Sequence, residues 1–301
     1  MSTVEVVREA ARISLADTTS RARRGRDAVF LGALWLSLLV AIVTLATLVT
    51  STLVTGIGSL DLRLVSSFPS PFPEDAGLQS ALFGSLWVTI TSGVVSLVVA
   101  LGTAIYLEEF ADPRSRIQRL VTVNIQTLAG VPSIVYGILG LAFFVRKPFD
   151  WGFTVGAAAA TLTMMVLPLM IVASREALKA VPPSLREGAY ALGATRWQTV
   201  RKQVLPAAVP GIATGSILGV SRAMGESAPL ILLGALAYVS YNPTSFASDF
   251  TVLPLLIFKW STEVQVEFRA LAAAAIIVLL AMLLALNLVA IVIRDRSRIS
   301  W

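Results

Sequence analysis

The chain has 301 residues, of which 56% are hydrophobic and only 14% are charged, whereas about a quarter of an average soluble domain is charged. This balance excludes a soluble globular protein and indicates an integral membrane protein. The absence of cysteine and histidine excludes disulfides, thiolate nucleophiles, imidazole bases and zinc sites built on either residue, and we expect no metal and no cofactor. The net charge of +6 follows membrane topology, as shown below, so we expect the lipid bilayer and no nucleic acid as a partner.

Residues 1–27 are rich in arginine and predict a cytoplasmic N-terminal arm. The apolar run that follows is too long for the core of a cleaved signal peptide, so we expect it to be retained.

Six apolar runs are long enough to form transmembrane helices, which need about 20 residues each. The loops on the side of the two termini carry most of the 24 lysines and arginines, so the positive-inside rule places both termini, including a tail at 294–301, in the cytoplasm. The sequence therefore predicts an all-α membrane protein with six transmembrane helices. We place these spans at about residues 28–55, 80–107, 122–145, 151–174, 208–238 and 268–293.

Two segments outside the spans are unusually apolar. Residues 56–79 hold three prolines and predict an extended outer loop. The stretch FTVLPLLIFKW, within residues 241–267, predicts a short interfacial helix against the outer face.

The third and fourth spans have features of their own. Only residues 146–150 separate them, which predicts antiparallel neighbours. Gly130, Pro132 and Gly137 predict a kinked or partly unwound third span, and Pro168 predicts a kink in the fourth. The hydroxyls of Ser133 and Tyr136 lie near the first break, where helix packing and hydrogen bonds to freed carbonyls explain them at least as well as a binding site does.

The loop between the fourth and fifth spans contains two helix signals. Ser184 and Glu187 have the spacing of a capping box behind two prolines, and Gly193 is placed to end the helix that follows. Thr195 and Gln198 repeat the pattern. We expect a helix, a glycine turn and a second helix that runs to a break at Pro206. Such an element needs a partner surface or must lie on the lipid.

The fifth span carries two charges inside an apolar run, Arg222 and Glu226, one helical turn apart in SRAMGESAPL. Arg222 lies about 24 Å along the helix from Pro206, near or beyond the bilayer midplane. An arginine at such a depth costs about 2.5–3.5 kcal/mol, so it must face protein or water. The pair either fixes helix register or forms an anion site on a transport path.

Small residues recur every four positions beside this pair. They form a ridge that lets another helix approach closely. The ridge consists of Gly211, Gly215, Gly219 and Ala223.

The stretch EGAYALGATRWQTVRKQVLP, residues 187–206, resembles the EAA loop of bacterial ABC importer permeases. Gly188 and Gln203 depart from the family pattern, in which alanine and an apolar residue stand at these positions. The resemblance implies that residues 182–206 dock on a separate ATP-hydrolysing subunit. Consistent with that division, the sequence contains no G-x-x-x-x-G-K-[ST] phosphate loop, so we expect no ATP hydrolysis by this chain and no catalytic residue. The residues that fall on the family spacing are Glu187, Ala189, Gly193, Leu205 and Pro206.

SRAMGESAPLI, TLAGVPSIVYGILG and EALKAVPPSLREGAYALGATRWQT together resemble the PstA-type permeases of phosphate ABC importers, over about residues 80–260. Ser227 stands where that family usually has threonine and keeps the hydroxyl. The resemblance implies the type I ABC importer permease fold in a prokaryotic cell membrane. It also implies four partners: a second homologous permease, an ATPase dimer, an extracytoplasmic phosphate-binding protein and inorganic phosphate.

On this reading Arg222 contacts the anion, because a guanidinium binds oxyanions through a planar fork and stays charged when desolvated. Glu226 either accepts a hydrogen bond from the acidic hydrogens of phosphate, which sulfate lacks, or neutralises Arg222 when the path is empty. The expected substrate path is formed by Arg222, Glu226, Ser227, Ser133 and Tyr136.

Two alternatives stay open. The chain could serve another oxyanion, such as sulfate, molybdate or phosphonate, because the EAA loop carries no information about substrate. It could also be a secondary transporter or a membrane scaffold without an ATPase.

Overall fold

The computed structural model describes residues 21–112, 114–233, 235 and 238–296. Most of the expected N-terminal arm, and residues 297–301 of the expected tail, lie outside these ranges. The described residues form helices and loops and contain no β-strand, in agreement with the predicted all-α class. The contacts between Cα atoms divide the chain into two units, residues 1–54 and 55–301, and each is described by itself.

The smaller unit contributes one helix, α2 (Arg21–Gly56). Its stretch from Arg26 onward is long and apolar enough to cross a membrane. The helix begins inside the predicted arm, so the helical segment starts before the apolar run itself.

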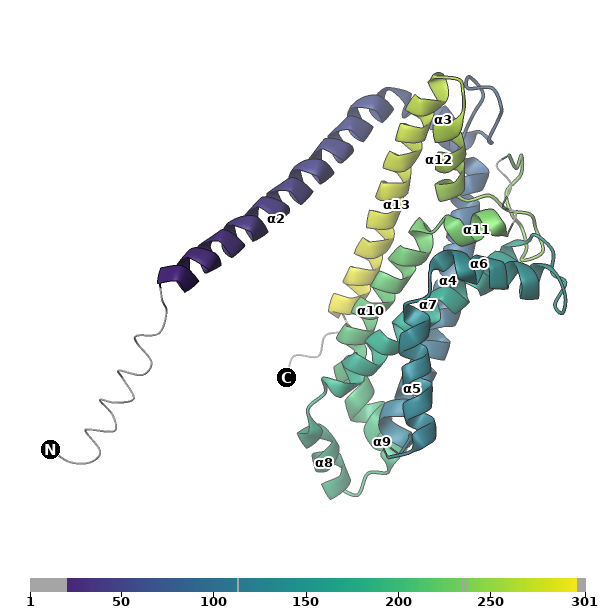
Figure 1. Cartoon of the computed structure of the whole chain (residues 1–301). Helices are drawn as coiled ribbons and strands as arrows, with labels where there is room; N and C mark the ends of the chain where they lie inside the picture. Colours follow the sequence, from purple (N-terminus) through teal and green to yellow (C-terminus); the bar gives the residue numbers. More distant parts are fainter. Residues whose placement is uncertain (1–20, 113, 234, 236–237, 297–301) are drawn as a thin grey trace. The chain divides into compact units, whose positions relative to one another are not determined.

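The larger unit holds four more helices that are long and apolar enough to span, and one bent pair. If the bent pair counts as one span, the described residues contain six spans with α2, which is the predicted number. Figure 1 shows these helices, with the bent pair in teal. They are α4 (Gln79–Ile105) with its extension η2 (Tyr106–Phe110), the bent pair α5 (Arg116–Ala129) and α6 (Ser133–Gly140) with η3 (Leu141–Val145), α7 (Val155–Lys179), α10 (Leu205–Gly225) and α13 (Glu267–Arg296).

Helix α7 is the centre of the larger unit and packs against α4, α5, α6 and α10. The predicted glycine ridge lies on its contact with α10. A Cβ atom at Gly211 would lie 2.7 Å from the Cβ of Ala177, and one at Gly215 would overlap Ala173. The ridge is confirmed, and its partner is the fourth span. Helix α7 itself continues through Pro168 without a break.

The outer segments form a second core with α13. Residues 56–79 were expected to be an extended loop, but they include η1 (Ile57–Ser59) and α3 (Leu62–Ser66). Asp61 caps α3 by accepting a hydrogen bond from the Leu64 amide. The predicted apolar helix is α12 (Leu253–Thr262), which packs on α13 and α4 and buries Trp260 completely.

The fifth span differs most from its prediction. The span was expected over residues 208–238 with a backbone loosened by Gly225 and Pro229, and the structure goes further: α10 ends at Gly225, Glu226 is extended, and a short helix α11 (Ala228–Leu232) follows. Glycine is a poor helix former, and Pro229 has no N–H to bond the carbonyl of Gly225. These two residues interrupt the helix, so Arg222 and Glu226 do not lie on one continuous helical face.

The third span is bent as predicted. Helices α5 and α6 meet at 102° across Gly130–Pro132. The break frees the last carbonyls of α5, and the buried Tyr136 hydroxyl donates to one of them, that of Leu128, over 2.9 Å. The hydroxyl of Tyr136 therefore stabilises the bend.

Candidate functional site

The charged pair of the fifth span lies at the break between α10 and α11. The Nε atom of Arg222 is 3.6 Å from Oε1 of Glu226, which is within ion-pair range but longer than a hydrogen bond. The side chain of Arg222 is 41% exposed in the isolated chain and that of Glu226 20%. The guanidinium is therefore paired only loosely and keeps donors available for a ligand.

The position of Arg222 in the last turn of α10 has a local reason. The last carbonyls of a helix lack intrahelical partners, and the negative end of the helix dipole favours a cation there. Ending the helix at Gly225 therefore helps to stabilise a charge that would be costly in the middle of an apolar helix.

The two broken spans meet at this point. Helix α11 packs on α6, and a Cβ atom at Gly137 would lie 2.7 Å from the Cα of Pro229. Tyr136 lies in the first turn of α6, directly before Gly137. The two breaks thus place the elements that carry all five predicted path residues around one junction.

The five residues differ in what they offer a ligand. Tyr136 already donates its hydroxyl to Leu128. Ser133 begins α6, and Ser227 precedes α11; both are half-buried. Helix α6 has no side-chain N-cap, so no N-cap side chain satisfies the first N–H groups of the helix. The junction combines one cation with hydroxyl and amide donors, which is a donor set suited to an oxyanion.

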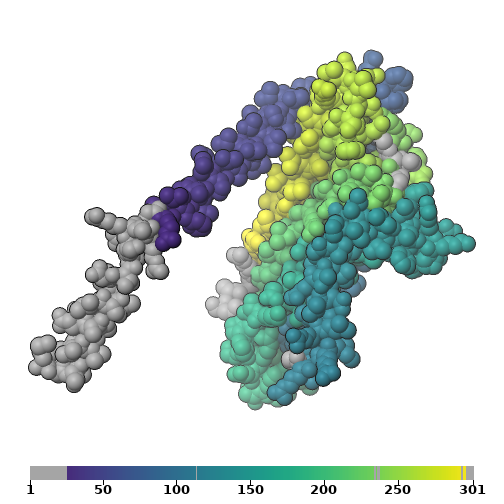
Figure 2. All heavy atoms as spheres, in the orientation of Figure 1, coloured from purple at the N-terminus to yellow at the C-terminus, as the bar shows by residue number. Residues whose placement is uncertain are grey.

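The second candidate site is the segment expected to dock on the ATPase, residues 182–206, which we call the coupling loop. Helix α8 (Pro183–Ala191) contains no buried residue, and the turn after it has Gly193 at φ +79°. Glu187 and Gly193 are exposed, and Ala189 is half-buried. In the space-filling view α8 forms part of the lower tip of the larger unit (Figure 2).

One of the two predicted capping boxes is wrong. Helix α8 begins at Pro183 with Pro182 as its N-cap, so Ser184 lies inside the helix and cannot cap it. The second box forms as predicted at the start of α9 (Arg196–Thr199). The amide of Gln198 donates to the Thr195 hydroxyl, and the amide of Thr195 donates to the Gln198 side chain over 2.8 Å.

The predicted break at Pro206 is also wrong. Helix α9 passes through a π-helical turn, η4 (Val200–Val204), into α10 without interruption. The amide of Leu205 bonds the carbonyl of Val200, one residue further back than in an α-helix, and this wider turn accommodates the proline that follows. Leu205 and Pro206 therefore begin the membrane helix, whereas Glu187, Ala189 and Gly193 lie on the projecting loop.

The loop exposes large apolar side chains beside its charges. Leu192 is 90% exposed, and Trp197 and Tyr190 are about half exposed. Clusters of this kind are typical of protein interaction sites.

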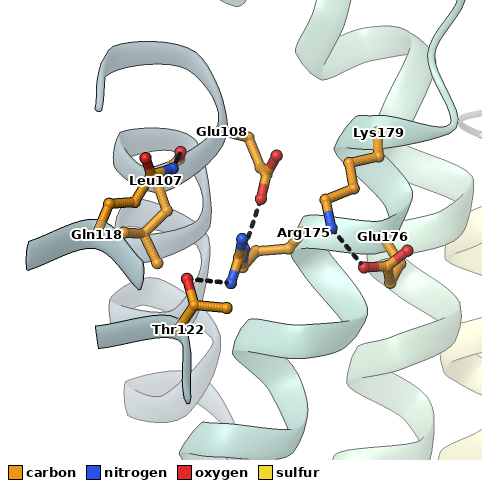
Figure 3. Close-up of polar contacts among 7 residues, drawn as sticks. All are labelled: Leu107, Glu108, Gln118, Thr122, Arg175, Glu176 and Lys179. Atoms are coloured by element: carbon orange, nitrogen blue, oxygen red, sulfur yellow. Dashed lines mark hydrogen bonds and ion pairs between the residues drawn. The ribbon is translucent and has the colours of Figure 1, made fainter. Parts of the chain in front are cut away.

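Four further charged residues, in and near this loop, were not predicted from the sequence to have a role. Glu108 and Glu109 lie in η2, and each pairs with an arginine, Arg175 on α7 and Arg186 on α8 respectively. Figure 3 shows the first of these pairs. Both arginines were treated only as orienting charges. The available signal was the pair of adjacent carboxylates at the basic, cytoplasmic end of a span.

Comparison with known proteins places the chain in a family. The family model described as "Binding-protein-dependent transport system inner membrane component" matches residues 96–298. A relative from Yersinia pestis, named "Phosphate transport system permease protein PstA", is 31% identical over 82% of this chain and 83% of its own length. "Phosphate transport system permease protein PstA 1" of Mycobacterium tuberculosis (strain H37Rv) is 33% identical over 72% of this chain and 70% of its own. "Probable ABC transporter permease protein YqgI" of Bacillus subtilis is 29% identical over 79% and 84%.

Solved structures share the fold. The MetNI methionine ABC transporter, in an inward-facing conformation, gives a TM-score of 0.58 at 18% identity and covers 73% of this chain and 95% of its own. A bacterial alginate ABC transporter in complex with its alginate-bound periplasmic protein gives 0.61 at 17% identity, over 88% and 93%. These likenesses concern the fold alone. The predicted fold class is thereby confirmed: this multi-pass chain belongs to the binding-protein-dependent transport system inner membrane components and is a permease subunit of type I ABC importer fold, not an enzyme.

Proposed function

We propose that the chain is one half of the permease of an ATP-driven importer of inorganic phosphate. Residues 28–293 form the six-span domain, with both termini in the cytoplasm. A second homologous permease completes the path, two ATPase subunits bind on the cytoplasmic side, and an extracytoplasmic binding protein delivers phosphate. The single observation that carries the substrate is Arg222, loosely paired at the junction of two broken spans. The names of the Yersinia and Mycobacterium relatives support the same substrate.

The chemistry of the junction suits a phosphate ion. The guanidinium of Arg222 offers a planar fork of donors and remains charged in a desolvated path. Its partner is at 3.6 Å and not hydrogen-bonded, so an incoming oxyanion can take its place without breaking a strong contact. These features favour binding that is weak enough for release.

Glu226 has two roles in the proposal. It neutralises Arg222 when no ligand is bound, which lowers the cost of a charge within the membrane. It also accepts a hydrogen bond from a protonated phosphate oxygen and repels an oxyanion that has no acidic hydrogen. The first role follows from their 3.6 Å separation, and the second from the charge of the carboxylate.

Helix α8 and the turn at Gly193 dock on the ATPase in this proposal. The face of α8 that carries Glu187, Gly188 and Tyr190 is exposed in this chain and is available to a partner. Docking there buries the apolar side chains of Leu192 and Tyr190. The unbroken helix from Arg196 to Gly225 then joins the loop directly to the Arg222 junction.

The test uses the complete complex with its ATPase and binding protein, and measures phosphate uptake into proteoliposomes. The variants are Arg222→Gln and Glu226→Gln. A hydrogen bond to a charged group contributes about 1.5–3 kcal/mol, so Arg222→Gln should lower uptake at limiting phosphate about 10–100-fold. Lys259→Gln is the matched control, because Lys259 forms another i,i+4 pair of similar exposure, with Glu263.

Normal uptake in both Arg222→Gln and Glu226→Gln, in complexes that assemble fully, would remove the proposed site. If both variants instead fail to assemble while the control assembles, the pair has the structural role of fixing the helices.

A further inference from the structure

The turn η2 (Tyr106–Phe110) at the end of α4 is a π-helical segment next to the coupling loop. Breaks of this type inside α-helices are frequent at functional sites. Four consecutive residues here contact four different elements, Leu107 through its carbonyl and the next three through side chains that point in different directions. We call residues 106–110 the relay turn.

On the membrane side, the relay turn is fixed to α5 and α7. The Nε atom of Arg175 donates to Glu108 over 2.5 Å, and Nη1 of the same guanidinium donates to the hydroxyl of Thr122 over 3.0 Å. The side chain of Gln118 donates to the carbonyl of Leu107 over 2.8 Å. Figure 3 shows these residues around the Arg175 guanidinium. Glu108 and Arg175 are 15% and 10% exposed, so water competes little for this contact.

On the cytoplasmic side, the relay turn binds α8, the first helix of the coupling loop. Glu109 is 5% exposed and accepts hydrogen bonds from Nη2 and Nε of Arg186, over 2.6 and 3.2 Å. Arg186 also donates to the carbonyls of Val181 and Leu178 at the end of α7, over 2.8 and 3.0 Å. Arg186 therefore uses its whole guanidinium to tie α8 to α4 and α7 at once. Helix α8 also packs through Leu185, which is half-buried against the hydrophobic cluster of Leu178, Val181 and Val204, so the tie adds to an apolar contact.

Phe110 adds a contact with α9. The guanidinium of Arg196 lies 5.4 Å from the centre of the Phe110 ring, and the ring of Trp197 lies 6.5 Å from it. Residues 107–110 thus contact α5, α7, α8 and α9 in order. Both halves of the coupling loop therefore contact the relay turn, α8 through hydrogen bonds and α9 through a cation-π contact.

We infer that Glu109 and Arg186 are positioning residues for energy coupling: through the relay turn they transmit displacement of α8 to the membrane helices α4 and α7. The inference rests on the proposed function, because it needs an ATPase that displaces α8. An exposed surface pair could not do this, since solvent competes for it. The Glu109 contact is buried and forked, so it resists both stretching and rotation.

The test compares Glu109→Gln and Arg186→Gln in the assembled complex, with ATP hydrolysis and phosphate uptake measured together. Lys179→Gln is the matched control, because Lys179 pairs with Glu176 on the same end of α7 but is exposed. Coupling free energies between protein sites correspond to about 5–150-fold effects, and we expect uptake per ATP hydrolysed to fall about tenfold in both variants. The control should match the wild type.

A second readout does not depend on the substrate. The chain has no cysteine, so a single cysteine at Ser133 reports on α6 alone. ATP should change the labelling of Ser133→Cys by a thiol reagent when it is the sole substitution and when it is combined with Lys179→Gln, and should change it much less when it is combined with Glu109→Gln or Arg186→Gln. If the wild type takes up no phosphate but the labelling of Ser133→Cys responds to ATP, the substrate assignment fails and the relay can still be judged.

An unchanged ratio of uptake to hydrolysis, together with an unchanged ATP response of the label, would overturn the inference. If the glutamine variants do not assemble, Arg186→Lys decides, because lysine keeps the charge but loses the fork. If Arg186→Lys takes up as much phosphate per ATP hydrolysed as the wild type, the inference that the forked contact transmits the movement is overturned. A lower uptake per ATP supports it.

Discussion

Exchanging a glycine and an alanine across the α7–α10 contact tests the packing of the fold. A Cβ atom at Gly215 would overlap the Cβ of Ala173, whereas ordinary contacts of this kind lie at 3.4–4 Å. In Gly215→Ala the helices must therefore separate by roughly 1 Å, and a close-packed interior resists such a shift. Overpacking costs about 1–3 kcal/mol, against a gain of about 1 kcal/mol in helix propensity.

Gly102→Ala, in α4, isolates the propensity term, because nothing lies within 4 Å of a Cβ atom there. The difference between the two variants should equal the packing cost. For a chain of this size, each kcal/mol corresponds to about 2–4 °C in the midpoint of thermal unfolding. Unfolding of the purified chain in detergent should rank Gly102→Ala above the wild type and Gly215→Ala below it.

The double variant Gly215→Ala/Ala173→Gly places the methyl group on α10 and removes the one on α7. Its midpoint of thermal unfolding should therefore return close to that of the wild type. The reasoning is refuted if Gly215→Ala is as stable as Gly102→Ala, or if the double variant is no more stable than Gly215→Ala.

Three further predictions concern the coupling loop and the charged pair. Gly193→Ala should destabilise the loop by about 1–2 kcal/mol, because Gly193 has φ +79°, and should therefore speed tryptic cleavage after Arg196. Gly188→Ala, in α8, should leave the cleavage rate unchanged, and equal rates in the two variants would contradict the prediction. Thr195→Ala removes the capping box, at a cost of about 0.5–2 kcal/mol, so hydrogen exchange at the start of α9 should accelerate, whereas unchanged exchange would mean that the box contributes nothing. Glu226→Gln should let sulfate compete with phosphate for uptake, since the amide no longer repels a deprotonated oxyanion; retained discrimination would leave Glu226 only the role of neutralising Arg222.

The elements that the sequence predicts well are those that depend on local pattern. The apolar runs, the glycine ridge and the capping box at Thr195 depend on periodicity and spacing, and the structure contains each of them. The bend in the third span follows from Gly130 and Pro132, which are adjacent to it.

The features that were predicted wrongly depend on hydrogen bonds that a residue pattern does not specify. Pro206 usually ends a helix, but the π turn before it supplies a carbonyl one residue further back and the helix continues. Pro229 acts as expected from its type, because together with Gly225, which was also expected to loosen the backbone, it interrupts the helix inside the membrane segment. The same residue type thus gives different results according to the turn that precedes it.

The buried ion pairs were missed for another reason. Glu109 and Arg186 are 77 residues apart, and only the folded bundle brings them together. The positive-inside rule assigns Arg186 to the cytoplasmic side from the number of basic residues there, but it does not predict which carboxylate Arg186 pairs with.

The central claim is that the importer transports phosphate, and competition for uptake tests this claim most directly. The complete complex with its binding protein is reconstituted in proteoliposomes, and ATP-dependent uptake of labelled phosphate is measured with an excess of unlabelled phosphate, sulfate or molybdate. The account predicts uptake that unlabelled phosphate abolishes and that the other two oxyanions leave unchanged. Uptake that sulfate or molybdate suppresses equally well, or a complex that moves labelled sulfate and not phosphate, would contradict it.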